Sequence, residues 1–336
     1  MWPLESIKPL RVGGKTAAFA MTVWLMTACF DGANPKATSL QFAGQDLRGR
    51  DFSGMDLSSA NFDGARLTGA NFVGAKLTGA SLKNADLRES YLRGVQANGA
   101  NFAEADLGGA DLTLAHLEKA NFDGANLSRS RLDGAQANEA SFDRAVLSGA
   151  HLVKAQLVQA RLRGAYLESA LMNQAVLRGA MLQGAILGAT GAAHQGPSPA
   201  KLAGVDAREA DFTGAQMTSV DLSEANLKSA RFVEARLEHA NFTWSHADLA
   251  NFSKARLGWV RAYSARFRHA QFDGAVLSQA QLEGADLTGA SLRSSTLDNT
   301  NLNQAKLEGV ATEGAQAQHV LTHATTGASP VLFQSR

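Results

Sequence analysis

The chain has 336 residues, 45% of them hydrophobic and 19% charged, so it is long enough to bury a substantial core. Its 32 basic and 31 acidic residues give a net charge of +1. This excludes the classes of protein whose binding depends on a large excess of positive or negative charge. Most hydrophobic residues are Ala, Leu or Phe at regular intervals, which is not the pattern of an ordinary enzyme domain.

Residues 1–28 have the pattern of a secretory signal peptide. Lys8, Arg11 and Lys15 precede an uncharged stretch over residues 16–28, which is too short to span a bilayer as a helix but suits the apolar region of a signal. We therefore expect the protein to be exported to the cell envelope rather than kept in the cytoplasm.

Cys29 is the only cysteine, and it ends this stretch in the order Leu-Met-Thr-Ala-Cys. Small residues before a cysteine look like a bacterial lipobox, so we predict lipidation of Cys29 and a lipid-anchored linker over residues 29–39. Phe30 favours the outer membrane, since inner-membrane lipoproteins of the resembled class carry Asp there. The alternative is an ordinary cleaved signal peptide with an incidental cysteine.

Two blocks, residues 40–187 and 200–309, repeat a unit of five residues. Positions numbered with a final 2 or 7 in these blocks number 52, and 47 of them are Leu, Phe or Met. Two residues earlier, Ala fills 39 of the 52 places, as in Ala-Asn-Phe-Asp-Gly from Ala60 to Gly64. Each unit therefore has a small residue, a large apolar centre and a final residue that is often Gly.

A period of five fits neither a helix nor a straight strand. On a helix the Leu and Phe residues would spiral around the axis, and in a strand they would alternate between the two faces. The chain must therefore turn once per unit, with the small residue and the centre pointing inward and the last residue at the corner.

Two patterns predict four units per coil. Several Phe centres recur every twenty residues, as at Phe102, Phe122 and Phe142, which would stack their rings in the core. Charged residues twenty apart between residues 40 and 309 form 15 opposite-charge pairs and only 4 like-charge pairs. Fifty-two units in rows of four predict about 13 coils.

These units resemble the pentapeptide-repeat family over about four-fifths of the chain. The resemblance implies an all-β fold, a right-handed quadrilateral β-helix, and it supplies the handedness. Members that protect DNA gyrase also suggest one possible function, a topoisomerase binder that mimics DNA.

The pattern is interrupted once and is lost at the end. Residues 188–199 are rich in Gly, Pro and Ser, so they form either a loop that leaves a continuous rod or a degenerate coil. Residues 310–336 lack the repeat and are expected to be a C-terminal cap or tail.

No residues suggest an active site. The closest histidines, His239, His246 and His269, lack the convergent geometry and fourth ligand that a zinc site needs, and the many carboxylates have cations available to pair with them. A β-helix enzyme acting on carbohydrate would need clustered Asp residues and a groove, for which there is no sign. We expect no enzyme activity, no metal and no cofactor.

One stretch of predicted surface differs from the rest, because aromatic and Arg side chains gather there as they do in protein interfaces. The candidate partner surface is Trp244, His246, Trp259, Arg261, Tyr263, Arg266 and Arg268. The alternative is that Trp244 and Trp259 only fill corners of the coil.

Two functions follow from these features. The favoured one is a non-enzymatic envelope lipoprotein, a rod that binds an unidentified protein and meets the membrane through the lipid on Cys29. The second is the gyrase-binding DNA mimic, which is disfavoured because residues 29–336 carry 29 basic and 30 acidic side chains. No nucleic acid is expected as a partner.

Overall fold

The computed structural model describes residues 40–188 and 198–327. The predicted signal peptide, Cys29 and the linker over residues 29–39 lie outside these ranges. The described residues contain no helix and no strand of several residues; each side of the coil contributes a single residue to a parallel ladder. No described segment forms a helix long and apolar enough to cross a membrane.

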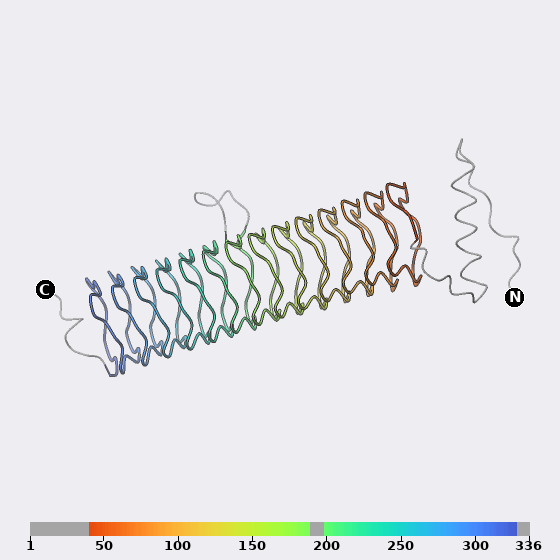
Figure 1. Ribbon diagram of the computed structural model, residues 1–336. Helices are drawn as coiled ribbons and strands as arrows, with labels where there is room; N and C mark the ends of the chain where they lie inside the picture. Colours follow the sequence, from red (N-terminus) through yellow and green to blue (C-terminus); the bar gives the residue numbers. More distant parts are fainter. Residues whose placement is uncertain (1–39, 189–197, 328–336) are drawn as a thin grey trace, which may run out of the picture. The chain divides into compact units, whose positions relative to one another are not determined.

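The chain winds into a four-sided coil whose successive turns stack along one axis (Figure 1). Bridges join residues twenty apart, so each fourth unit returns to the same side. We number the sides by their first bridge residues: face 1 starts at Gln41, face 2 at Asp46, face 3 at Asp51 and face 4 at Asp56. The two sequence patterns that predicted four units per coil are therefore confirmed.

Each coil is held to the next by backbone hydrogen bonds. The N–H of Phe62 donates to the carbonyl of Ser81 at 2.7 Å, and the N–H of Asn61 donates to that of Leu40 at 2.8 Å. Within the unit, the N–H of Ala65 donates back to the carbonyl of Phe62 at 2.9 Å and closes the turn. The same hydrogen bonds repeat along the rod. They pair the backbone N–H and carbonyl groups, which the apolar core could not pair.

The corners explain why the last residue of a unit is often Gly. Corner residues have a left-handed backbone, with φ near +60°, which glycine adopts without a steric penalty. Many corners nevertheless carry a side chain, and among them are Trp244 with φ 58° and Trp259 with φ 57°.

The Asp and Asn residues that precede the centres also have a local role. The side-chain oxygen of Asn61 accepts from the N–H of Asp63 at 2.9 Å, and that of Asp106 accepts from the N–H of Gly108 at 3.0 Å. Such Asx turns stabilise the bend into the corner. Asn amides also reach the next coil, as from Asn126 to Asp106 at 2.9 Å.

The core is a narrow column of Ala, Leu and Phe side chains that are almost completely buried. Phe102, Phe122 and Phe142 stack on face 1 with ring centroids 4.7 and 4.9 Å apart and nearly parallel planes. This spacing matches the distance between paired strands, because each ring belongs to one coil.

The described coils form one continuous rod on both sides of the interruption at residues 188–199, which we call the excursion. Bridges across it join Leu171 to Lys201 and Ile186 to Gln216, thirty positions apart instead of twenty. The N–H of Ala200 donates to the carbonyl of Leu187 at 2.7 Å, which is the type of bond that closes nearly all the other corners. Twelve residues thus separate Leu187 from Ala200, where two separate the corresponding residues of other units.

This shift of ten has a consequence for the core. Because Met181 bridges to Asp211, Phe212, Phe232 and Phe252 lie on face 1 like Phe142, with Leu162 and Leu182 as the centres between the two Phe stacks. The column therefore keeps one side of the rod through both repeat blocks.

The coil continues past Gly309, where the sequence pattern ends. Ala311, Gln316, Leu321 and Thr326 still bridge to the preceding coil, so each face has fourteen bridge positions rather than about thirteen. The inward centres here are Thr312, Ala317 and Thr322 instead of Leu or Phe, and they are only half-buried. Residues 310–327 thus end the rod with a coil of small and polar centres.

Candidate partner-binding surface

The seven residues singled out from the sequence lie on two adjoining faces and their corners. Arg261 and Tyr263 lie on face 3, and His246, Arg266 and Arg268 lie on face 4. Trp244 forms the corner between these two faces, while Trp259 forms the corner between faces 2 and 3. The backbone N–H of Trp244 donates to the carbonyl of Tyr263 at 3.0 Å, which places these two aromatic residues on neighbouring coils.

The aromatic side chains are exposed. The exposed fraction is 60% for Trp244, 49% for Trp259 and 38% for Tyr263, so none of them fills the core. Trp244 and Trp259 also have the left-handed backbone of a corner, which costs a residue with a side chain conformational energy that glycine would avoid. Two unfavourable features at the same position, strain and apolar exposure, are typical of a side chain that has a function on the surface.

Trp259 is held in place by neighbours on the same corner of adjacent coils. Its ring stacks on His239 with centroids 5.2 Å apart, and its Nε1–H donates to Gln279 Oε1 at 2.6 Å. The sequence reasoning did not include His239 or Gln279 in the surface. Their separation of twenty from Trp259 was the signal that could have found them.

The three arginines of the surface differ in their partners. Arg266 pairs with Asp248, and Arg268 Nε donates to Asp286 Oδ2 at 2.7 Å. The hydrogen bond to Asp286 raises the pKa of Arg268, so this guanidinium is committed to its neighbour. Arg261 has no hydrogen bond or ion pair from its side chain among the described residues.

Nearly all ion pairs of the described rod follow three separations; Arg178 and Asp206, on either side of the interruption, are the exception. Arg88 pairs with Asp86 in its own row, Arg266 with Asp248 diagonally at a separation of eighteen, and Lys76 with Asp56 directly at twenty. A separation of twenty would pair Arg266 with Asp286 and Arg268 with Asp248, whereas in the structure the two arginines exchange these acids.

Large exposed apolar side chains are unevenly distributed among the faces. Nine of the ten in the described chain come from rows of faces 2 and 3, and the exception is Leu249. They are Tyr166, Trp259 and Val276 on face 2, and Val73, Tyr91, Leu114, Trp244, Tyr263 and Leu321 on face 3. Faces 2 and 3 are therefore better suited to contact a protein than faces 1 and 4.

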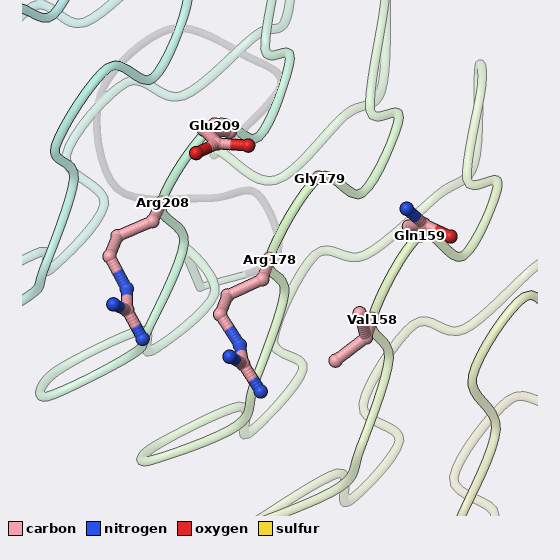
Figure 2. A pocket seen from close by; sticks show the side chains of 6 residues that line it. All are labelled: Val158, Gln159, Arg178, Gly179, Arg208 and Glu209. Carbon is pink, nitrogen blue, oxygen red and sulfur yellow. The ribbon is translucent and has the colours of Figure 1, made fainter.

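A shallow depression lies elsewhere, on face 4. Its lining residues are Val158, Gln159, Arg178, Gly179, Arg208 and Glu209, and Figure 2 shows the side chains of Arg178 and Arg208 side by side. Both guanidinium groups lie near Asp206. Arg208 donates two hydrogen bonds to this carboxylate, each at 2.8 Å, and Arg178 Nε forms an ion pair with it at 3.7 Å. The hydrogen bond from Arg208 lowers the pKa of Asp206, so this carboxylate serves in ion pairing rather than in proton transfer near neutral pH.

Charge is balanced on every side of the rod. Among the outward-pointing residues of the described coils, acidic and basic side chains differ by no more than one on any face. Within these coils, no group of three or more His, Cys, Asp and Glu residues is placed to hold a metal ion.

The comparison with protein families finds a match to the model described as pentapeptide repeats. It matches in eight copies, over residues 38–74, 70–113, 98–134, 125–164, 160–189, 200–232, 225–268 and 270–309. No functionally curated protein matches the chain.

Solved structures that resemble the chain include three repeat proteins. HetL, involved in heterocyst differentiation regulation in the cyanobacterium Nostoc sp. strain PCC 7120, is 24% identical, covers 89% of this chain and 92% of its own, and has a TM-score of 0.20. A protein of the Arabidopsis thaliana thylakoid lumen is 40% identical over 36% of this chain and 73% of its own, with a TM-score of 0.17. Full-length QnrB1, a plasmid-mediated fluoroquinolone resistance protein, is 14% identical over 81% and 93%, with a TM-score of 0.19. With TM-scores this low, the family assignment depends on the repeat match.

Proposed function

We propose that this chain, which belongs to the pentapeptide-repeat family, is an exported rod that is anchored by a lipid on Cys29 and binds a protein partner. Members of this family form right-handed β-helices and are generally non-catalytic. The partner would bind faces 2 and 3 over residues 244–268.

The exposure of three aromatic side chains within two coils carries the proposal. Trp244, Trp259 and Tyr263 are exposed, Trp244 more than any other large apolar residue of the described rod, and Trp259 is fixed by His239 and Gln279. Rigid aromatic side chains with Arg beside them are the residues that contribute most to protein interfaces.

The DNA-mimic alternative receives no support from the surface. A mimic of DNA needs a continuous row of negative charge along the rod, because the partner's DNA-binding site recognises closely spaced phosphates. Here acids and bases balance on each face, so no face offers that row.

Replacement of two aromatic residues tests the binding site. Trp259→Ala and Tyr263→Ala should each weaken capture of the partner from envelope extracts by about 2 kcal/mol or more, as central interface residues do. Lys76→Ala is the matched control, because Lys76 is exposed at the other end of the rod and pairs only with Asp56 at 3.8 Å. Circular dichroism checks that the variants remain folded. Equal capture by all three variants would remove these residues as a binding site.

Replacement of Cys29 tests the anchor. Cys29→Ser should abolish labelling by radioactive palmitate and release the protein from the membrane fraction, because the thiol is the acyl acceptor. Labelling of the Ser variant at the level of the parent would show that the lipid is not on Cys29.

A further inference from the structure

One coil of the rod is basic throughout. Residues 251–270 contain five cationic side chains and no carboxylate, although acids and bases balance over the rod as a whole. The five are Lys254, Arg256, Arg261, Arg266 and Arg268. Neighbouring coils must therefore supply any carboxylates that neutralise this one.

Four of the five cations obtain such a partner. Lys254 lies 3.8 Å from Glu234, and Arg256 lies 2.9 Å from Glu238, both from the preceding coil. Arg266 pairs with Asp248 of that coil and Arg268 with Asp286 of the following one. These pairs cover faces 1, 2 and 4.

Arg261, on face 3, is the exception. Its bridge neighbours on the two adjacent coils are Asn241 and Gln281, whose amides carry no charge. The nearest acids of this face are engaged elsewhere: Asp221 accepts from Asn241 at 3.0 Å, and Glu283 accepts from Asn301 at 3.4 Å. The guanidinium thus keeps its hydrogen-bond donors available to a group from outside the chain.

Exposed aromatic side chains surround this free guanidinium. Trp259 precedes Arg261 at one corner of face 3, Tyr263 follows it, and Trp244 forms the opposite corner on the preceding coil. An exposed Arg can form two parallel hydrogen bonds to a carboxylate, while the rings beside it accept an apolar chain.

We propose that face 3 at Arg261 recognises an acidic peptide segment of the partner, with one carboxylate on the guanidinium and an apolar residue against Trp259 and Tyr263. This inference rests on the proposed function, because it names the chemistry of the partner for the same surface. It also assigns different roles to the three arginines, since only Arg261 would contact the partner's charge.

Charge along the face favours a peptide over a nucleic acid. Single-stranded nucleic acids need a groove of several cations that follows the phosphate backbone. On face 3, Glu283 lies on the following coil, and Asp221 and Glu224 lie two coils before Arg261. These acids would repel phosphates along the rod. A short acidic segment needs only the one cation.

A peptide of alternating Glu and Phe tests the proposal, with binding to the full-length protein measured by fluorescence anisotropy of the labelled peptide. The same peptide with Gln in place of Glu should bind about tenfold more weakly or worse, because a hydrogen bond to a charged group contributes more than a neutral one. Arg261→Gln should reduce affinity for the Glu peptide by a similar factor. Arg93→Gln is the matched control, since Arg93 is exposed on face 3 without an ion pair and follows the exposed Tyr91.

Three results would overturn the proposal: equal affinity for the Glu and Gln peptides, equal affinity of wild type and Arg261→Gln, or preferential binding of a ten-nucleotide oligothymidine. The outcome is separate from that of the proposed function. Partner capture that depends on Trp259 but not on Arg261 would retain the binding surface and reject the acidic segment. Selective peptide binding without any captured partner would retain the acidic-segment site and reject the envelope partner of the proposed function.

Discussion

At the scale of single residues, each position of the unit has a physical reason. Ala at the small inward position, such as Ala125, lets neighbouring faces approach, because a larger side chain would collide with the centres of the core. Asn or Asp before the centre caps its own turn, as Asn121 does for the N–H of Asp123 at 2.9 Å. The corner requires a left-handed backbone, and among the many residues with a side chain at this position Trp244 and Trp259 are the largest.

Trp244→Gly should therefore leave the fold almost unchanged. Glycine removes the left-handed strain at φ 58° but increases the entropy of the unfolded chain, so the free energy of unfolding should stay within about 1 kcal/mol of wild type. Urea unfolding measures this directly. A loss of several kcal/mol would show that the Trp244 side chain supports the rod and is not a free surface group.

At the scale of the coil, the aromatic column makes each turn depend on its neighbours. Phe122 lies between Phe102 and Phe142, with both rings stacked on it within 5 Å, and it is fully buried. Each coil thus contacts only the coil before it and the coil after it. The free energy of unfolding of a solenoid is therefore approximately a sum of contributions from single coils and from their contacts with neighbouring coils.

Phe122→Ala should lower the free energy of unfolding by about 3–5 kcal/mol, because a cavity would remain in a core that cannot collapse around it. Lys83→Ala is a suitable control, since the Lys83 side chain is exposed and forms no ion pair in the described structure. Asp123 is not suitable, because its carboxylate accepts from the N–H of Asp143 on the next coil at 3.0 Å. Denaturant melts in which the Lys83 variant loses more stability would contradict the core assignment.

The excursion is the second feature at this scale. Replacing residues 188–199 with two residues, Arg-Gly as at Arg178 and Gly179, should preserve the rod, because Leu187 and Ala200 already have the geometry of a normal corner. A shorter connection also lowers the entropy cost of closure, so stability should rise by about 1 kcal/mol. Thermal melting of this variant against wild type decides it, and a large loss of stability would assign the excursion a structural role.

At the scale of the whole rod, surface charge forms a ladder of ion pairs and hydrogen bonds. Arg88 binds Asp86 with two hydrogen bonds, at 2.8 and 2.7 Å, and Thr68 adds a third at 3.0 Å. The hydrogen bond from Arg88 is the main cause that lowers the pKa of Asp86 from 3.8 to about 2, against the opposing effect of burial. Where the pKa shifts of other Asp residues are resolved, as at Asp51 and Asp206, they are also downward.

This ladder predicts the direction of acid sensitivity. Since the pKa of Asp86 is lower in the folded state, its stabilising contribution is complete above about pH 4 and is lost as the pH falls toward 2. Asp86→Asn should lower stability at pH 7 by about 1 kcal/mol after screening by solvent, and the difference from wild type should vanish near pH 2. Melting temperatures of both proteins from pH 7 to pH 2 check this, and a difference that grows toward low pH would contradict it.

The sequence by itself determined the repeating unit, the four-sided coil and the inward positions. Each unit has Ala before Leu or Phe and a corner after it, and the chain repeats this order many times. Because every unit has the same local preference, one stacked arrangement suits them all. The separation of twenty between Phe residues and between opposite charges then fixed the number of sides. The sequence also selected the seven surface residues, because their composition departs from the polar background.

Only the tertiary structure decided how the irregular parts fit. It showed that Leu187 and Ala200 meet at one corner and that residues 310–327 add another coil, since backbone pairing tolerates centres such as Thr312 and Ala317 that break the pattern. It also separated Arg261 from Arg266 and Arg268, which bind Asp248 and Asp286 diagonally across coils. That difference depends on where long side chains reach between stacked turns, and a linear pattern of residue types does not contain that information.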